Sequence, residues 1–160
     1  MGYRKYFNPI LNIAIIIACL GLVAALMHRY NLASRGSNRT ISLDGVDFSQ
    51  SKKTLLLFFQ HDCEVCQASL PFYRSLLQES PVRTSVQFVF ITPEAPNLAA
   101  RFLQENGISS VTVLQGRHGI LGVKSTPTLI LADSGAAVRG YWVGQLTPER
   151  EAEIRKGLGQ

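Results

Sequence analysis

Cysteine is scarce in this chain, which contains only three among its 160 residues: Cys19, Cys63 and Cys66. Three cysteines are too few for a small fold that disulfides hold together. The single Cys-x-x-Cys pair also lacks the second pair that a structural zinc site normally needs. We therefore expect neither a disulfide scaffold nor a bound metal.

Long runs of basic residues are missing as well. The sixteen Lys and Arg residues exceed the eleven Asp and Glu residues, which gives a formal net charge of +5, but the basic residues are scattered. No stretch interleaves aromatic residues with arginines as a nucleic-acid groove would. We therefore expect no nucleic-acid partner. A modest basic excess beside a membrane is more typical of contact with anionic headgroups.

The longest apolar segment covers residues 10–27, where no residue is charged and only Asn12 is strongly polar. Its length lies at the lower limit of what spans a bilayer as a helix. A retained transmembrane anchor is favoured, since the run exceeds a normal signal-peptide core and no Ala-x-Ala site follows. A cleaved secretory signal is one alternative. A lipoprotein with lipid on Cys19 is another, although residues 20–27 remain apolar after that cysteine.

The sequence accordingly divides into four parts. Residues 1–9 form a polar leader, 10–27 the anchor, 28–40 a tether rich in Ser, Asn and Arg, and 41–160 a domain of common size. Basic residues flank the anchor on both sides, so that the charge pattern does not set the orientation in the membrane.

Within residues 41–160 the pattern predicts alternating strands and helices. Apolar, β-rich runs predict strands at 55–59, 85–91, 111–114, 129–131 and 137–143. Helical spacing and proline or glycine boundaries predict helices from Cys66 to Ser80, from Pro96 to Gly107, and from Pro148 onward. We also expect a small hairpin over 41–48 with a tight Asp44-Gly45 turn, and a kink at Pro71. This order predicts an α/β fold with parallel pairing.

Cys63 and Cys66 stand where a buried strand passes into a helix. Residues 55–59 form a short, continuous apolar run, and helical spacing begins directly after the cysteines. Unpaired backbone N–H groups and the positive end of the helix dipole stabilise a thiolate at such a position. We expect Cys63 to be the nucleophile, and Cys66, one turn inward, to be the resolving thiol.

This stretch resembles the active-site segment of thioredoxin-fold proteins, in particular the membrane-anchored bacterial thiol–disulfide oxidoreductases of the TlpA/ResA type. Phe58, Cys63, Cys66 and Pro71 match the pattern of that family. The resemblance covers roughly residues 45–155. It implies a thioredoxin-like α/β fold, with a central mixed sheet flanked by helices.

The chain departs from the family at four positions. Phe59 and Asp62 stand where the family usually has tryptophans, and Ser69 stands where several relatives carry a glutamate that handles protons. Leu57 takes the place of the aspartate that thioredoxins themselves bury. The cysteine pair and its setting are kept, whereas the usual buried proton acceptor is missing.

A second motif, Thr126-Pro127-Thr128, directly precedes a predicted strand. It resembles the family segment whose proline is cis and packs against the cysteine pair. The resemblance implies that Thr126 and Pro127 bind the substrate, with the backbone of Thr126 offered to an extended substrate chain as at a sheet edge.

The function implied by the resemblance is that of a protein thiol–disulfide oxidoreductase without a cofactor. Cys63 exchanges disulfides with a protein substrate that carries a disulfide or thiol pair, Cys66 completes the exchange, and a redox partner recycles the pair. The resemblance also implies a bacterial, single-pass protein of the cytoplasmic (inner) membrane, anchored through residues 10–27, with its soluble domain on the periplasmic side.

Two further residues are candidates for tuning the pair. His61, when protonated, would favour the Cys63 thiolate, or it is simply exposed in its loop. Glu64 would shuttle protons or shape partner choice, or it is a solvated carboxylate. Two other functions remain open: a Cu(I)-binding metallochaperone that uses both thiols with His61 or His118, and a non-catalytic assembly module.

Overall fold

The structure is a computed structural model that describes residues 13, 15–23, 39–79, 84–117 and 119–159. The chain forms two compact units, Met1–Arg35 and Gly36–Gln160. In the first unit, residues 13 and 15–23 are helical. Over the described part of the chain, no helix is both long and apolar enough to cross a bilayer. Much of the predicted anchor (10–12, 14 and 24–27), the predicted leader and most of the predicted tether lie outside the described residues.

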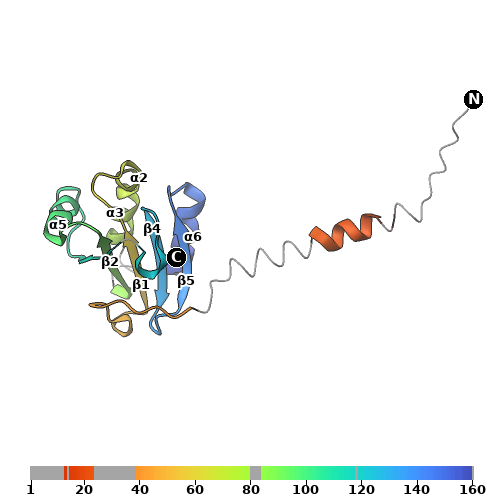
Figure 1. The fold of residues 1–160 in the computed structure, drawn as a ribbon, viewed down its shortest axis with the longest axis horizontal. Coiled ribbons are helices and arrows are strands. Elements are labelled where there is room, and N and C mark those ends of the chain that lie inside the picture. The colour runs from red at the N-terminus through yellow and green to blue at the C-terminus, as the bar shows by residue number, and fades with distance from the viewer. Residues whose placement is uncertain (1–12, 14, 24–38, 80–83, 118, 160) are drawn as a thin grey trace, which may run out of the picture. The chain divides into compact units, whose positions relative to one another are not determined.

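The second unit is built on a five-stranded sheet with the order β3-β2-β1-β4-β5 (Figure 1). The strands are β1 (Lys53–Phe58), β2 (Val86–Thr92), β3 (Thr112–Gln115), β4 (Thr128–Asp133) and β5 (Val138–Val143). The central β1 pairs in parallel with β2, and β2 with β3, whereas β4 runs antiparallel to both β1 and β5. The sheet is therefore mixed, and each predicted strand is present.

The helices are α2 (Glu64–Ala68), α3 (Leu70–Gln78), α5 (Pro96–Glu105) and α6 (Pro148–Leu158), with the short 3-10 helices η1 (Phe48–Gln50) and η2 (Ile120–Gly122). One face of the sheet packs Leu55, Leu57 and Phe90 against buried residues of α3, α5 and α6. The other face packs Leu56, Phe58 and Val89 against the segment before β1 and the η2 region. Since β1 is covered on both faces, its sequence is continuously apolar rather than alternating.

The predicted hairpin over residues 41–48 is wrong. Asp44 and Gly45 do form a turn, in which the Val46 N–H donates to the Leu43 carbonyl at 3.1 Å, but neither side of the turn is a strand. The chain instead enters η1, where the Asp47 carboxylate accepts a hydrogen bond from the Ser49 N–H at 2.9 Å. This capping contact gives the backbone an alternative to strand pairing.

The predicted break at Pro71 is found as a division into two helices. Ser69 separates α2 from α3, and Pro71 lies in the first turn of α3, where a missing N–H is tolerated. The Ser69 N–H still donates to the Cys66 carbonyl at 3.1 Å, so that the backbone stays bonded across the break. The helix ends at Gln78; the predicted stop at Ser80-Pro81 lies outside the described residues.

Gly140 of β5 lies under the ring of Trp142. A Cβ at position 140 would come within 2.1 Å of the Trp142 ring, and the indole N–H is held by Glu153 of α6 at 3.1 Å. We expect Gly140→Ala to lower the free energy of unfolding by about 1–3 kcal/mol, the typical effect of an overpacked site. Denaturation followed by the fluorescence of the single tryptophan measures this. Gly135→Ala, whose Cβ meets only the Asp133 side chain at 3.4 Å, is the matched control; equal stability of the two variants would contradict the prediction.

Candidate active site

Cys63 is the residue at which α2 begins. It is the N-cap, with extended backbone angles, and its sulfur accepts a hydrogen bond from the Cys66 N–H at 3.2 Å. The Gln67 N–H in turn donates to the Cys63 carbonyl at 3.0 Å. Cys63 is half-buried, so a substrate in solution can reach its sulfur. The hydrogen bond from the Cys66 N–H would stabilise a thiolate at the same sulfur.

Cys66 is buried, with 2 % of its surface exposed, and both thiols are free. Burial first, and the hydrogen bond with Cys63 second, raise the pKa of Cys66 from its ordinary value of 9.0 to about 12. The Gln60 backbone and the Thr126 hydroxyl act in the opposite direction on this pKa. Cys63 is half-buried whereas Cys66 is buried, which is the difference in access that a nucleophile and a resolving cysteine require.

The segment around Pro127 meets the cysteines because of the strand register. Phe58, the last residue of β1, pairs with Thr128, the first residue of β4. The residues after β1 and those before β4 are consequently neighbours, and the Thr126–Pro127 peptide bond there is cis. The Cys63 thiol lies 3.8 Å from the Thr126 carbonyl oxygen. The Thr126 hydroxyl donates to the Gln60 side-chain oxygen at 3.3 Å.

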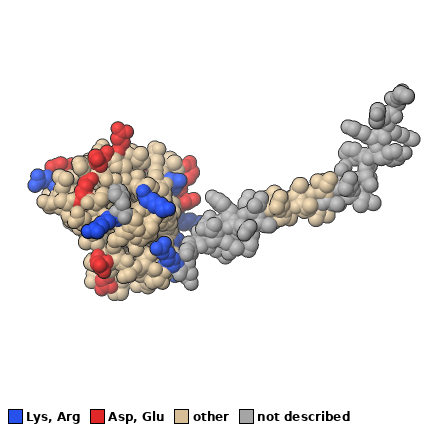
Figure 2. Space-filling model, viewed as in Figure 1, with Lys and Arg blue, Asp and Glu red and all other residues tan. Residues whose placement is uncertain are grey.

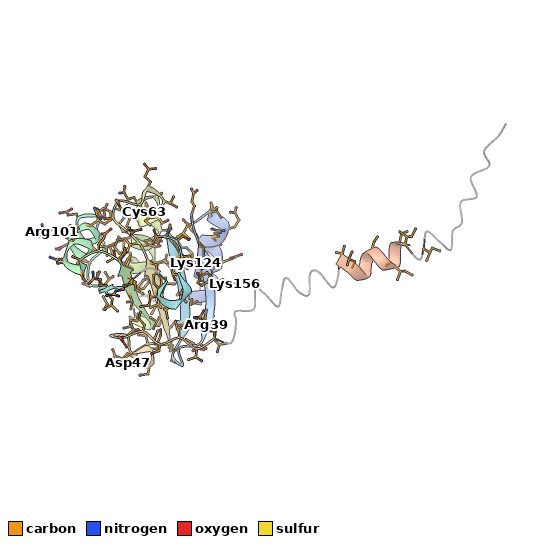
Figure 3. All side chains as sticks on the ribbon, in the orientation of Figure 1. Arg39, Asp47, Cys63, Arg101, Lys124 and Lys156 are labelled. Atoms are coloured by element: carbon orange, nitrogen blue, oxygen red, sulfur yellow. The ribbon has the colours of Figure 1, made fainter. Side chains whose placement is uncertain are left out.

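Figure 3 places Cys63 at the end of the second unit that carries α2, far from Arg39 and Asp47. The neighbours of Cys63 in sequence, Asp62 and Glu64, are both exposed. Figure 2 shows acidic side chains over this same end. Glu64 lies in the first turn of α2, where a carboxylate is favourable to the helix dipole, and its exposure fits a solvated role.

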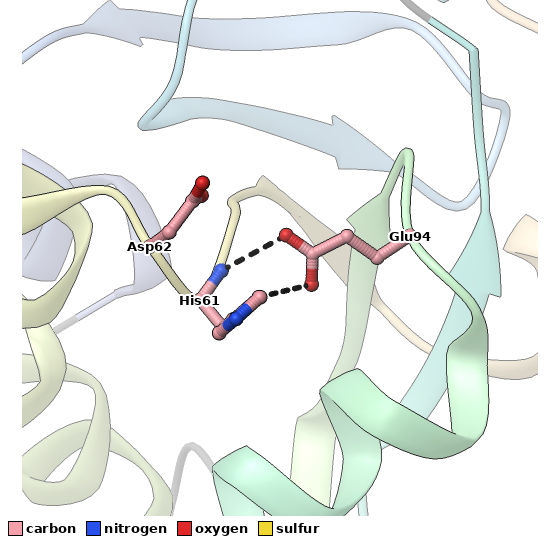
Figure 4. Close-up of side chains that lie close together, drawn as sticks. All are labelled: His61, Asp62 and Glu94. Atoms are coloured by element: carbon pink, nitrogen blue, oxygen red, sulfur yellow. Dashed lines mark hydrogen bonds and ion pairs between the residues drawn. The ribbon is translucent and has the colours of Figure 1, made fainter.

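His61 is held in place by Glu94, a residue that the sequence analysis did not single out. One Glu94 oxygen accepts the His61 backbone N–H at 3.3 Å, and the other lies 2.7 Å from the His61 ring nitrogen Nδ1 (Figure 4). Glu94 therefore orients the His61 side chain, of which 42 % is exposed. A signal for Glu94 did exist, since it follows β2, and the carboxyl ends of the parallel strands β1 and β2 meet at one edge of the sheet.

Leu57 and Ser69, the two positions at which the resemblance led us to expect acids, are both buried. Leu57 is 1 % exposed and packs in the core, and the buried Ser69 hydroxyl donates to the Val65 carbonyl at 3.0 Å. Among the buried side-chain polar atoms that the structure describes, only the Tyr73 hydroxyl has no hydrogen-bond partner. Burial raises the pKa of Tyr73, and the nearby Ser69 hydroxyl partly opposes this.

Comparison with known proteins identifies the fold. Similar solved structures include a thioredoxin-family thiol:disulfide interchange protein from Chlorobium tepidum, with 20% identity over 68% of this chain and 81% of that chain and a TM-score of 0.54. A thiol-disulfide isomerase from Corynebacterium glutamicum is 20% identical over 78% of this chain and 94% of that chain, with a TM-score of 0.53. A secreted disulfide oxidoreductase from Mycobacterium tuberculosis is 16% identical over 67% and 80%, with a TM-score of 0.51.

No protein-family model and no curated protein matches the sequence. The structural likeness, together with the mixed sheet and the helices that cover it, confirms the predicted α/β class. The second unit of the chain, Gly36–Gln160, has the thioredoxin-like fold.

Proposed function

We propose that this protein is a thiol–disulfide oxidoreductase that exchanges its Cys63–Cys66 dithiol with the disulfide of a protein substrate. The observation that carries the proposal is the position of the Cys63 sulfur, between the Cys66 N–H at 3.2 Å and the Thr126 carbonyl at 3.8 Å. A half-exposed thiol beside a buried one is suited to two successive exchange steps. The activities named for the structurally similar proteins above agree with this.

In the first step the Cys63 thiolate attacks one sulfur of the substrate disulfide. That bond breaks, a Cys63–substrate disulfide forms, and the leaving substrate thiolate takes up a proton. In the second step Cys66 loses its proton and attacks the Cys63 sulfur, so that the substrate leaves as a dithiol and the Cys63–Cys66 disulfide remains. Two electrons pass to the substrate, and a separate redox partner must return them; the reverse sequence would oxidise a substrate.

Thr126 and Pro127 would hold the substrate chain during both steps. The Thr126 carbonyl already lies beside the Cys63 sulfur, so a peptide bound to this backbone would bring its own cysteine to the nucleophile. Backbone pairing of this kind accepts many sequences, because the contacts go to main-chain atoms. This suits an enzyme that acts on protein cysteines.

We propose further that residues 10–27 anchor the protein in the bacterial inner membrane as a single-pass helix, and that 28–40 tether the domain of residues 41–160 on the periplasmic side. The uncharged apolar run of residues 10–27 supports the anchor. The similar protein from Mycobacterium tuberculosis is secreted, which agrees with a domain outside the cytoplasm. Alkylation of Cys63 in intact cells by a reagent that does not cross the inner membrane tests the side, and protection of Cys63 until the cells are lysed would contradict it.

Replacing Cys66 by serine tests the exchange mechanism directly. The Cys66→Ser variant should accumulate a disulfide between Cys63 and its substrate, because the second step cannot occur. Non-reducing electrophoresis of the purified full chain, followed by mass spectrometry of the attached protein, detects the adduct. The double variant Cys63→Ser/Cys66→Ser is the control and should carry nothing. A Cys66→Ser variant that is reactive toward alkylating reagents but never captures a partner would contradict the proposal.

The geometry does not favour the alternative of a Cu(I) carrier. Among the residues that the structure describes, the one group of three potential metal ligands consists of His61, Asp62 and Glu94, and contains neither Cys63 nor Cys66. His118, the other predicted ligand, lies outside the described residues. A non-catalytic assembly module would tolerate Cys63→Ser. Substrate capture by Cys66→Ser and turnover by Cys63→Ser both test this alternative.

A further inference from the structure

Three side chains with metal-binding atoms meet beside the active-site turn. One His61 ring nitrogen, one Asp62 carboxylate oxygen and one Glu94 carboxylate oxygen all lie within 4.8 Å of one another. His61 and Asp62 come from the turn before α2, and Glu94 comes from the loop that follows β2 (Figure 4). Residues 33 positions apart thus contribute to one cluster.

We propose that this cluster binds a divalent zinc ion through His61, Asp62 and Glu94. One imidazole nitrogen and two carboxylate oxygens, with a fourth position left to water, form a donor set that Zn²⁺ accepts. Imidazole disfavours Mg²⁺ and Ca²⁺, which take oxygen ligands, and the absence of thiolate from the set disfavours Cu(I). The two carboxylates together supply the charge that neutralises the ion.

The distances allow the ion to enter with small changes. At zinc–ligand distances of about 2.0–2.2 Å, two donors of a tetrahedral site stand about 3.4 Å apart. The Nδ1–Oε2 distance of 2.7 Å between His61 and Glu94 must widen slightly, and the ion then takes the place of the proton between them. Asp62 is exposed, so that its carboxylate can turn inward to close the third distance.

The two principal ligands are already fixed in position. Glu94 is only 17 % exposed in its side chain, and it also accepts the His61 backbone N–H at 3.3 Å. Gln67 of α2 donates to the His61 carbonyl at 2.6 Å, and the Phe102 ring of α5 packs against the imidazole with 6.1 Å between ring centres. Because contacts from the Glu94 loop, α2 and α5 already hold His61 in place, little conformational freedom is lost when the ion binds.

The cluster contains neither cysteine, so its metal binding can be measured without the thiols. Its binding is therefore measured on the full chain, purified in detergent, with Cys19, Cys63 and Cys66 all replaced by serine; these are the only cysteines in the sequence. Titration calorimetry with zinc chloride should show one ion per chain. His61→Ala and Glu94→Gln should each weaken the affinity by at least about 10-fold. Glu64→Gln, which removes a nearby carboxylate outside the cluster, is the matched control and should leave the affinity unchanged.

A second measurement needs no substitution in the cluster. In the same cysteine-free chain, zinc should shift the NMR signals of the His61 imidazole, and a millimolar excess of Mg²⁺ should not reverse the shift. Three results would overturn the proposal: no zinc binding by the cysteine-free chain, an affinity that His61→Ala and Glu94→Gln leave unchanged, or unshifted His61 signals in the presence of zinc. None of these bears on exchange by Cys63 and Cys66, so the two proposals fail separately.

Discussion

Replacing Cys63 by serine is expected to lower the rate of protein disulfide reduction by more than about 10³-fold, the scale on which loss of an enzyme nucleophile acts. A serine hydroxyl is not ionised near neutral pH and forms no disulfide. Cys66 cannot substitute for Cys63, because it is 2 % exposed and burial raises its pKa to about 12. Reduction of insulin disulfides, with dithiothreitol as the final reductant, provides the measurement.

Two control variants make this result specific. Cys66→Ser should keep the first attack, seen as one equivalent of captured substrate, but should lose turnover. Cys19→Ser should keep full turnover, because Cys19 lies in the first unit of the chain, Met1–Arg35, outside the site. Turnover by Cys63→Ser at the unmodified rate would show that the nucleophile has been assigned to the wrong sulfur.

The second step of the exchange should depend steeply on pH. In the mixed disulfide, the hydrogen bond and the charge of Cys63 no longer raise the pKa of Cys66. Burial, the largest cause of the shift, still holds this pKa above its ordinary value of 9.0. Only the thiolate attacks, and below the pKa its fraction grows about tenfold per pH unit. We therefore expect the rate of substrate release to rise about tenfold per pH unit from pH 6 to pH 9.

Rapid mixing of the mixed disulfide between Cys63 and a chromophoric aromatic thiol measures this release. Thr126→Val removes the hydroxyl that lowers the pKa of Cys66, so it should shift the profile toward higher pH. Thr54→Val, at a buried hydroxyl in β1 that bonds Gln87, is a matched control that should leave the profile in place. A release rate that does not change between pH 6 and pH 9 would reveal a proton acceptor beside Cys66 and contradict the prediction.

Much of this fold is encoded locally in the sequence. The apolar run of β1 identifies a strand buried on both faces, and Pro71 identifies the break between α2 and α3. The cysteine pair is placed correctly at the start of a helix, because strand and helix patterns meet there. The contact between Thr126 and Cys63 was expected only from family resemblance, since it depends on the register of β1 with β4.

Other features depend on competing or long-range contacts that no local pattern reveals. The segment before β1 resembles a hairpin, but the Asp47 side chain caps η1 and prevents the second strand. In the sequence, nothing distinguishes Glu94 from other acidic loop residues. Only the pairing of β2 with β1 places it beside His61. In the sequence, Tyr73 fits the apolar face of the predicted helix. The pattern does not indicate that its buried hydroxyl lacks a hydrogen-bond partner.

The single residue Ser69 separates the short helix that carries Cys66 from the longer helix that fills the core. Since α2 is a separate helix of five residues, we expect formation of a Cys63–Cys66 disulfide to move α2 more than α3. Tyr73 and Leu76 of α3, both almost fully buried, can keep their packing in the two oxidation states. If Cys63 and Cys66 exchange disulfides as proposed, we therefore expect the interior to be the same in both oxidation states.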